Sequence, residues 1–159
     1  MEVVVGIADM RVSDDSDVVL AAYSLGSCIG VAVWDPAVRV GGLLSFMLPD
    51  SKVAPEKAQQ NPCMFADTGI PLLLDACEEK GAERKRMVVK LAGGTQPLDS
   101  EAFLDVGRRN LAVALEILEE NGLSVDAKDV GGMLNLTLKL EVGTGKVWVV
   151  AANREVRAL

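Results

Sequence analysis

The sequence predicts an α/β fold of largely antiparallel sheets with two main helices, the arrangement of an α/β sandwich. Apolar runs of strand length crowd the first third of the chain, and two longer segments have helical spacing. The 159 residues are 50% hydrophobic, which suits one ordinary domain with a sizeable core. No linker or composition break divides them, so we expect residues 1–159 to form a single domain.

Four apolar runs predict strands near the N-terminus, because they are rich in Val and Leu and are separated by polar residues, Gly or Pro. The runs are residues 3–8, 18–23, 29–34 and 40–48. Pro36 follows Asp35 between the last two runs, which favours a turn and therefore a hairpin.

The C-terminal part predicts a second hairpin. Leu134, Leu136, Leu138 and Leu140 alternate with polar residues, as in a strand with one buried face. A Gly-containing turn at residues 143–145 then leads into a final apolar run. These strands, with one at residues 86–94, complete the expected sheets.

Residues 65–82 predict the first helix, with Asp67 or Thr68 as the N-terminal cap and Gly81 as the C-terminal stop. Pro71 fits this helix only if it lies in the first turn, because proline cannot donate a backbone hydrogen bond. Cys77 lies on the apolar face of this helix and is expected to pack in the core.

A second helix is predicted from Asp105, as its cap, to Asn121 and Gly122, which end it. Its apolar face consists of residues that recur at helical spacing, namely Leu111, Ala114, Leu115 and Leu118.

Composition argues against several classes of function. The net charge of −7 disfavours nucleic-acid binding, and the short basic cluster at residues 83–90 is expected to be a solvated strand entry. No apolar run approaches the roughly 20 residues of a membrane helix, and the N-terminus lacks a basic leader. We therefore expect a cytoplasmic protein that inserts into no membrane.

Neither a metal site nor a cofactor site is predicted. The chain has no histidine, and its three cysteines form no CxxC pair. The glycine-rich corners match no nucleotide-binding fingerprint. Cys63 is expected to be an ordinary loop thiol. Cys28 differs, because it follows Gly26 and Ser27 at the start of an apolar run. From the residues alone, Cys28 is either a small buried side chain or a nucleophile.

Several motifs in register resemble the CheD family of bacterial chemoreceptor glutamine deamidases. These are "LGSCIGVAVWDP", "VGGLLSFMLPDS", "FADTG", "KLAGG", "VGRRN", "AKDVGG" and "TGK", and the similarity runs from about residue 3 to residue 150. The resemblance implies an α/β sandwich related to the catalytic domains of cytotoxic necrotizing factor toxins. It also implies hydrolysis of receptor glutamine side chains, with methyl-accepting chemoreceptors and the CheY phosphatase CheC as partners.

The resemblance also assigns site positions. The nucleophile of the family falls on Cys28, its acid–base histidine on Ser45 and its assisting threonine on Ala22, so two of the three groups are absent. The pocket positions implied by the same motifs are Gly26, Ser27, Phe46, Gly93, Gly94, Gly131 and Gly132. Val130 and Met133 replace a threonine and an asparagine that are usual in the family, which makes the surroundings of the pocket more apolar.

Loss of the imidazole is expected to reduce the deamidase activity severely, since a free thiol is largely protonated at neutral pH and ammonia leaves poorly without a proton donor. The first hypothesis is therefore a weak or inactive CheD protein that acts by binding. Its helix-binding groove would include Cys28, Phe46, Met47 and Leu98. One alternative is an active deamidase with another acid–base group, such as Asp50. Another is an interaction module outside chemotaxis.

Overall fold

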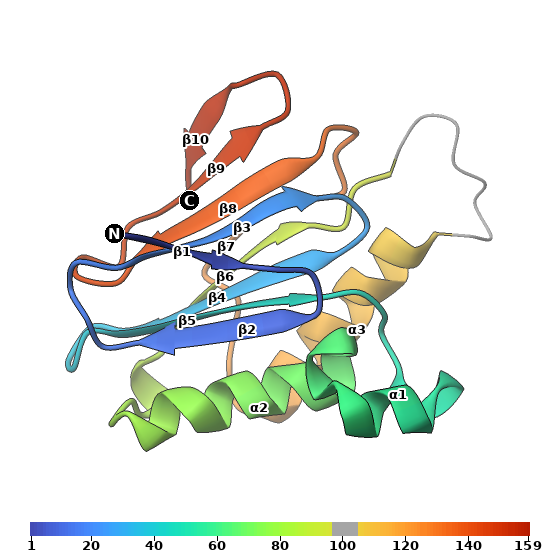
Figure 1. Ribbon diagram of the computed structural model, residues 1–159, viewed down its shortest axis with the longest axis horizontal. Helices are drawn as coiled ribbons and strands as arrows, with labels where there is room; N and C mark the ends of the chain where they lie inside the picture. Colours follow the sequence, from blue (N-terminus) through green and yellow to red (C-terminus); the bar gives the residue numbers. More distant parts are fainter. Residues whose placement is uncertain (97–104) are drawn as a thin grey trace.

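The computed structural model describes residues 1–96 and 105–159, whose strands form two five-stranded sheets packed face to face (Figure 1). The first sheet has the order β1 (Glu2–Val5), β3 (Val19–Leu25), β8 (Leu136–Glu141), β9 (Val147–Ala151) and β10 (Val156–Ala158). The second has the order β2 (Asp9–Ser13), β5 (Val40–Phe46), β4 (Ile29–Asp35), β6 (Val88–Gly93) and β7 (Ala127–Val130). The predicted sandwich is confirmed.

Antiparallel pairing dominates both sheets, as the short connections predict. Strands β4 and β5 form the hairpin expected around Pro36, with Asp35 opposite Val40. Strands β8 and β9 form the second expected hairpin. Parallel pairing occurs between β1 and β3 and between β6 and β7.

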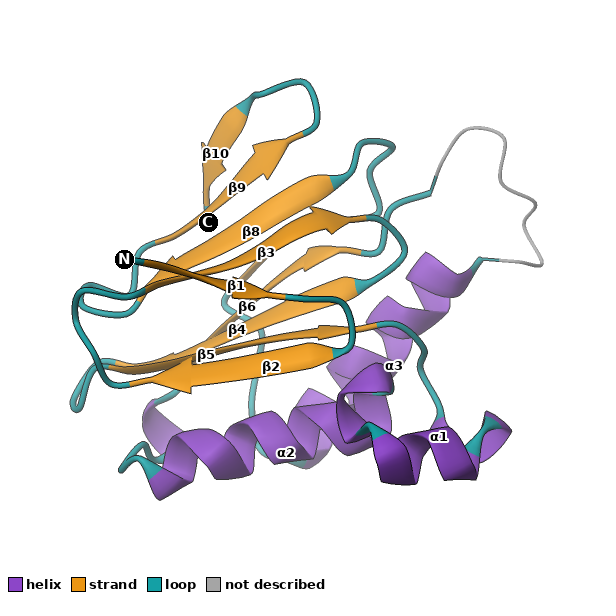
Figure 2. Ribbon diagram, viewed as in Figure 1, coloured by secondary structure: helices purple, strands orange, loops and turns teal. Residues whose placement is uncertain are grey.

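The helices are α1 (Pro55–Gln60), α2 (Ala66–Glu79) and α3 (Val106–Glu120). Of these, α2 and α3 pack on the outer face of the second sheet (Figure 2). Two apolar cores result from this layering. A helix-side core lies between α2, α3 and the second sheet, and an inter-sheet core lies between the two sheets. Successive residues of β4 and β5 face these two cores in turn, which explains why almost every residue of both strands is buried.

The start of α2 differs from the prediction. Its N-cap is Phe65, and the carboxylate of Asp67 instead accepts hydrogen bonds from the backbone N–H and hydroxyl of Ser51. Pro71 lies inside the helix and not in its first turn. Burial of the apolar face holds the helix together through this position, so packing overrides the local preference. The end is as predicted, since Gly81 follows the helix with φ of +102°.

Both ends of α3 agree with the sequence prediction. The side chain of Asp105 accepts a hydrogen bond from the backbone N–H of Arg108 and caps the first turn. Asn121 is the C-cap, and Gly122 follows it with φ of +75°.

Strands β2 and β7 were not predicted, because each is short and lies at an edge of its sheet, with mostly half-exposed residues. The first predicted strand is shorter than expected and ends at Val5, since the chain turns at residues 6–8 with a positive φ at Ala8. Strand β8 begins at Leu136, so Leu134 lies in the preceding loop.

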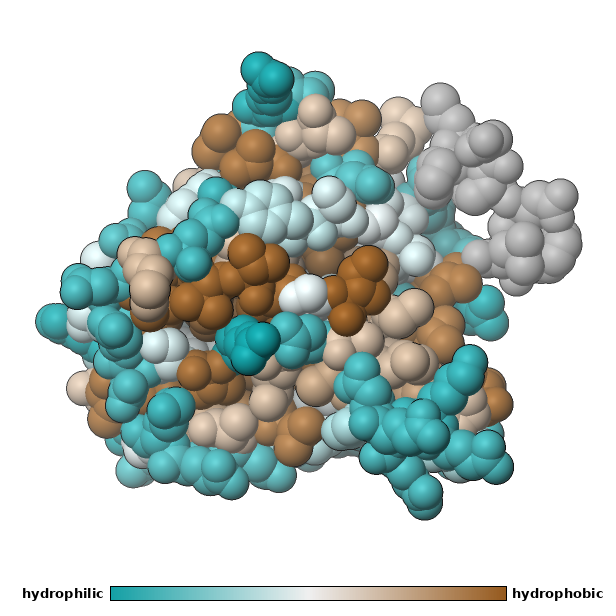
Figure 3. All heavy atoms as spheres, in the orientation of Figure 1, coloured by the Kyte–Doolittle hydropathy of each residue, from teal (hydrophilic) through white to brown (hydrophobic). Residues whose placement is uncertain are grey.

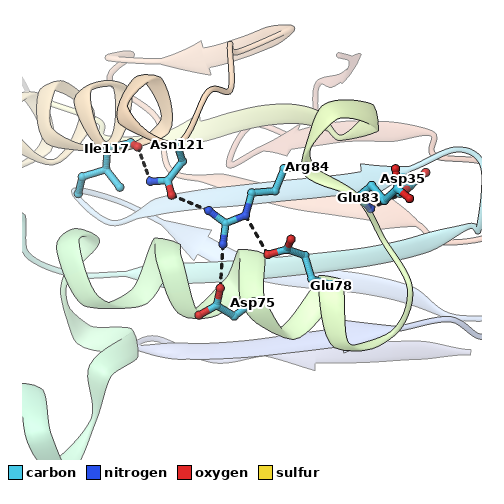
Figure 4. A network of polar contacts seen from close by, with 7 residues as sticks. All are labelled: Asp35, Asp75, Glu78, Glu83, Arg84, Ile117 and Asn121. Carbon is cyan, nitrogen blue, oxygen red and sulfur yellow. Dashed lines mark hydrogen bonds and ion pairs between the residues drawn. The ribbon is translucent and has the colours of Figure 1, made fainter.

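The basic cluster before β6 is used within the fold (Figure 4). The guanidinium of Arg84 donates to Asp75 and Glu78 of α2 at 2.8 Å each, and to the side-chain carbonyl of Asn121 at 2.6 Å. The Asn121 amide in turn donates to the carbonyl of Ile117. This network joins the ends of the two main helices, so the cluster does more than the solvated strand entry predicted from the sequence.

On the outside, Figure 3 shows a hydrophobic stretch along edge strand β1 and the turn after it, where Val4 and Ile7 are exposed. None of the described helices is both long and apolar enough to cross a bilayer.

Candidate active site

The loop that carries Cys28 lies at one end of the sandwich, the right-hand end in Figure 1, between β3 and β4. Ser27 is exposed, whereas Gly26 and Cys28 are half-buried. The Cys28 side chain packs against the inter-sheet core, directly before β4 enters the second sheet. The cysteine is therefore neither a fully buried core residue nor a freely exposed thiol.

Ser45 and Ala22 face the same core. Ala22 belongs to the inter-sheet core and is 1% exposed. Ser45 alternates with Leu44 and Phe46, which point to the helix side, so its side chain points between the sheets. It lies opposite Gly30, two residues after Cys28, on the neighbouring strand. The positions assigned to nucleophile, base and assisting group thus converge on one core.

The end of β6 holds the cysteine loop by backbone hydrogen bonds. The N–H of Gly94 donates to the carbonyl of Cys28 at 2.9 Å, and the N–H of Thr95 donates to the carbonyl of Gly26 at 2.8 Å. Gly93 has φ of +104°, and a Cβ there would lie 2.3 Å from the Cys28 carbonyl oxygen. Only glycine fits this close approach between the two chain segments.

The loop after β7 joins the same end. The N–H of Gly131 donates to the carbonyl of Gly93 at 3.2 Å, and the N–H of Gln96 donates to the carbonyl of Gly132 at 2.8 Å. Farther along, the side chain of Asn135 approaches Gly26. Gly131 and Gly132 are exposed and flank the cysteine loop through these bonds.

Phe46, a pocket position implied by the resemblance, lies elsewhere than expected. Phe46 is fully buried in the helix-side core, on the face of β5 opposite to Ser45. Leu98, expected in the binding groove, lies outside the described residues. Asp50 caps the short turn at residues 51–53 by accepting from the backbone N–H of Lys52, and it lines a surface cavity between α2 and α3.

The electrostatics of the thiols follow from burial. Desolvation raises the pKa of Cys28, and the backbone N–H of the same residue opposes this rise. Burial raises the pKa of Cys63 and brings that of Cys77 to about 12. The chain has no histidine to withdraw the Cys28 proton. In the described residues, no group of three or more His, Cys, Asp or Glu side chains is arranged to hold a metal ion.

Two polar residues, Asn110 and Thr95, lie beside the cysteine loop and were not predicted to belong to the site. Asn110 of α3 is fully buried, and its side-chain amide donates to the carbonyl of Ser27 at 2.9 Å and to that of Met47 at 2.8 Å. Thr95 is 3% exposed. The only signal for Asn110 is its place in the "VGRRN" motif, which carries no role by itself.

Three buried polar atoms of this region have no hydrogen-bond partner among the described residues. They are Ser45 Oγ, Thr95 Oγ1 and Asn110 Oδ1. Unpaired buried polar atoms are costly and concentrate at functional sites. Their clustering at one end of the sandwich marks this end as the candidate site.

Comparisons with known proteins show which family the chain resembles along its length. The family described as CheD chemotactic sensory transduction matches residues 47–151. The chain is 46% identical to the probable chemoreceptor glutamine deamidase CheD 1 of Syntrophus aciditrophicus, over 99% of both chains. It is 43% identical to the probable deamidase CheD of Solibacter usitatus, over 93% of this chain and 88% of that one.

A third relative, the probable chemoreceptor glutamine deamidase CheD of Thermococcus kodakarensis, is 40% identical over 92% of this chain and 91% of its own. Similarity of this degree over nearly the whole length, with the sandwich fold and the cysteine loop in place, leads to one conclusion. The chain belongs to the CheD family.

Proposed function

We propose that this CheD protein acts in cytoplasmic chemotaxis signalling mainly by binding, and that its glutamine deamidase activity is weak or absent. Its partners are the helical cytoplasmic region of methyl-accepting chemoreceptors and a CheC-type phosphatase that competes for the same surface. The observation that carries the proposal is Ser45, a buried hydroxyl at the position of the family's histidine, in a chain without histidine.

The chemistry supports this proposal. Deamidation requires a thiolate to attack the carboxamide carbon and a proton to reach the departing ammonia. Burial raises the pKa of the Cys28 thiol, so the thiolate is scarce at neutral pH. A serine hydroxyl titrates far above neutral pH and cannot replace imidazole as general base or acid, and such acid–base catalysis contributes about 10² to 10⁴ in rate. Activity should fall by at least that factor.

An apolar surface beside the cysteine loop supports binding. Met133 and Leu134 are 60% and 45% exposed and line a cavity of about 220 Å³ with Leu136, Asp129 and Arg157. This segment leads directly into Asn135, whose side chain lies against Gly26. Exposed apolar side chains with a nearby ion pair suit the apolar face of an amphipathic helix.

The alternative of an active deamidase with another acid–base group has less support. Asp50 is engaged in capping and lines a cavity on the helix side, whereas Cys28 packs against the inter-sheet core. A carboxylate beside the thiol would also disfavour the thiolate, because like charges repel. An interaction module outside chemotaxis is disfavoured by relatives named as chemoreceptor deamidases.

The first experiment measures activity. The protein is incubated with a receptor cytoplasmic fragment, and mass spectrometry follows the gain that accompanies conversion of each glutamine to glutamate. We expect no gain above the Cys28→Ala variant, while a CheD relative that retains the histidine serves as the positive control. Conversion that depends on Cys28 would establish the active alternative.

The second experiment measures binding. In a titration with the same fragment or a CheC homologue, Cys28→Trp should abolish binding because the indole fills the site, and Cys28→Ala should leave the affinity nearly unchanged. Each variant is used only if its circular dichroism spectrum matches that of the wild-type protein, which shows that it is folded. Equal affinities of the two folded variants would place the binding surface elsewhere.

A further inference from the structure

Asn110 connects two segments of the candidate site that are distant in sequence. It lies one turn into α3, fully buried, and its amide nitrogen uses both hydrogens on backbone carbonyls. One carbonyl belongs to Ser27, directly before Cys28, and the other to Met47, directly after β5 and two residues after Ser45. A single side chain therefore holds the ends of both segments that carry the assigned nucleophile and base positions.

The bond to Ser27 fixes the peptide group that precedes the cysteine. The carbonyl and N–H of a trans peptide point in opposite directions from one rigid plane. Because Asn110 holds the Ser27 carbonyl toward α3, the N–H of Cys28 points away from the helix. The same N–H opposes the effect of burial on the thiol pKa.

Among the residues that the structure describes, no other side chain donates a hydrogen bond to the Ser27 carbonyl. Gly94 and Thr95 donate to the carbonyls of Cys28 and Gly26, which lie on either side of the Ser27 carbonyl. Ser27 itself is exposed. Among the described residues, the Asn110 amide is the side chain that donates to the Ser27 carbonyl.

We propose that Asn110 is a positioning residue for Cys28: it fixes the orientation of the Ser27–Cys28 peptide, whose N–H belongs to the residue that carries the thiol, and it ties this peptide to the end of β5. The inference rests on the Cys28 site of the proposed function and extends it to α3. Without the amide, the peptide turns more freely, its N–H opposes the effect of burial on the thiol less consistently, and the thiolate forms less readily.

The test measures the pH dependence of Cys28 alkylation by iodoacetamide. Peptide-resolved mass spectrometry separates Cys28 from Cys63 and Cys77. Asn110→Leu keeps the approximate shape and removes both donors, and Asn110→Ala leaves room for water to bond the freed carbonyls. In both variants we expect Cys28 to react about three- to tenfold more slowly below its pKa, with the midpoint of the profile moved to higher pH.

The matched control is Asn121→Ala. The Asn121 amide also donates to a backbone carbonyl and takes part in the Arg84 network, but at the far end of α3 (Figure 4). This variant should lose stability and keep the wild-type alkylation profile of Cys28. A folded Asn110 variant with an unchanged profile would overturn the proposal.

A measurement on the wild-type chain covers the case in which both Asn110 variants fail to fold. The side-chain ¹⁵N–¹H resonances of Asn110 should shift along the titration of Cys28, with the same midpoint, because the amide holds the peptide beside the thiolate. Resonances that stay fixed through that titration would refute the coupling. Neither measurement uses a receptor, so a failed binding or deamidation assay leaves this test intact.

Discussion

Ser45 is the residue on which the proposed loss of deamidase chemistry depends. Its side chain faces the inter-sheet core with Ala22, and its hydroxyl has no hydrogen-bond partner among the described residues. An apolar residue would avoid that cost, and an imidazole would give the position a function. The buried hydroxyl does neither, which is consistent with a polar site that has lost its chemistry.

Restoring the two absent groups tests this interpretation. The double variant Ser45→His with Ala22→Thr should increase deamidation of a receptor fragment above the wild-type level, and Ser45→His alone should increase it less. Because both sites are about 1% exposed, the larger side chains should lower the free energy of unfolding by about 1–3 kcal/mol. Mass spectrometry and urea unfolding measure the two effects.

The informative control adds Cys28→Ala to the double variant, which should remove any gained activity at the same stability. A double variant that folds and gains nothing would show that the geometry around position 45 has drifted from that of the family.

At the scale of residues, the sequence could supply positions but not surroundings. The motif around Cys28 placed the nucleophile position at a loop before a strand, as found. The orientation of Phe46 was missed, because whether Ser45 or Phe46 faces the pocket depends on which face of β5 the helices cover. Strand alternation gives two faces and does not say which one carries the site.

At the scale of elements, α2 tolerates Pro71 in its interior. The proline lacks the N–H that would bond the carbonyl of Asp67, four residues earlier. Pro71→Ala should therefore raise the free energy of unfolding by about 1–3 kcal/mol, measured by urea unfolding. Substitution of the neighbouring exposed residue by alanine, Leu72→Ala, should not raise the free energy of unfolding. A Pro71→Ala variant no more stable than wild type would mean that the proline packs too well to replace.

Elements with strong patterns were predictable, and those defined by their partners were not. Alternating leucines predicted strand β8, and a cap at Asp105 with a stop at Gly122 predicted α3. Strand β7 has four residues and exists because β6 offers a parallel edge. Such pairing depends on a neighbour 37 residues away, which local periodicity does not contain.

At the scale of the whole molecule, the site is assembled by contacts across the chain. Asn110 reaches Ser27 and Met47 over 83 and 63 residues. Each acceptor is a backbone carbonyl, which every residue type has. The residue types at positions 27 and 47 therefore cannot predict the contact. This is the physical reason why the place of Cys28 in a loop before a strand was predictable and its support from α3 was not.

A second long-range polar contact holds the turn of the β4–β5 hairpin to the segment before β6. Asp35 is fully buried and accepts from the Arg86 guanidinium at 2.8 Å and from the backbone N–H groups of Glu83 and Ala37. Burial alone would raise the pKa of Asp35. The hydrogen bonds from Arg86, Glu83 and Ala37, with the charge of Arg86, outweigh it and lower that pKa below its ordinary value.

A lowered carboxyl pKa makes this contact a source of pH-dependent stability. Its contribution is complete above the pKa of the unfolded chain, about 4, and is lost as the pH falls through the lower folded-state value. Asp35→Asn should lower the free energy of unfolding by about 2–4 kcal/mol at pH 7, because it leaves the Arg86 charge without its carboxylate. The difference from wild type should shrink at acidic pH, where the native carboxyl is protonated too.

Urea unfolding between pH 7 and pH 2 measures this difference. The matched control is Asp75→Asn, which removes a carboxylate partner of Arg84 at a side chain that is 61% exposed and should change stability little at any pH. If the gap between Asp35→Asn and wild type stayed constant down to pH 2, hydrogen-bond geometry and not charge would hold the hairpin turn. A gap that closes with acid assigns the stability to the ionised carboxylate, which then links the second sheet to the chain segment that returns from α2.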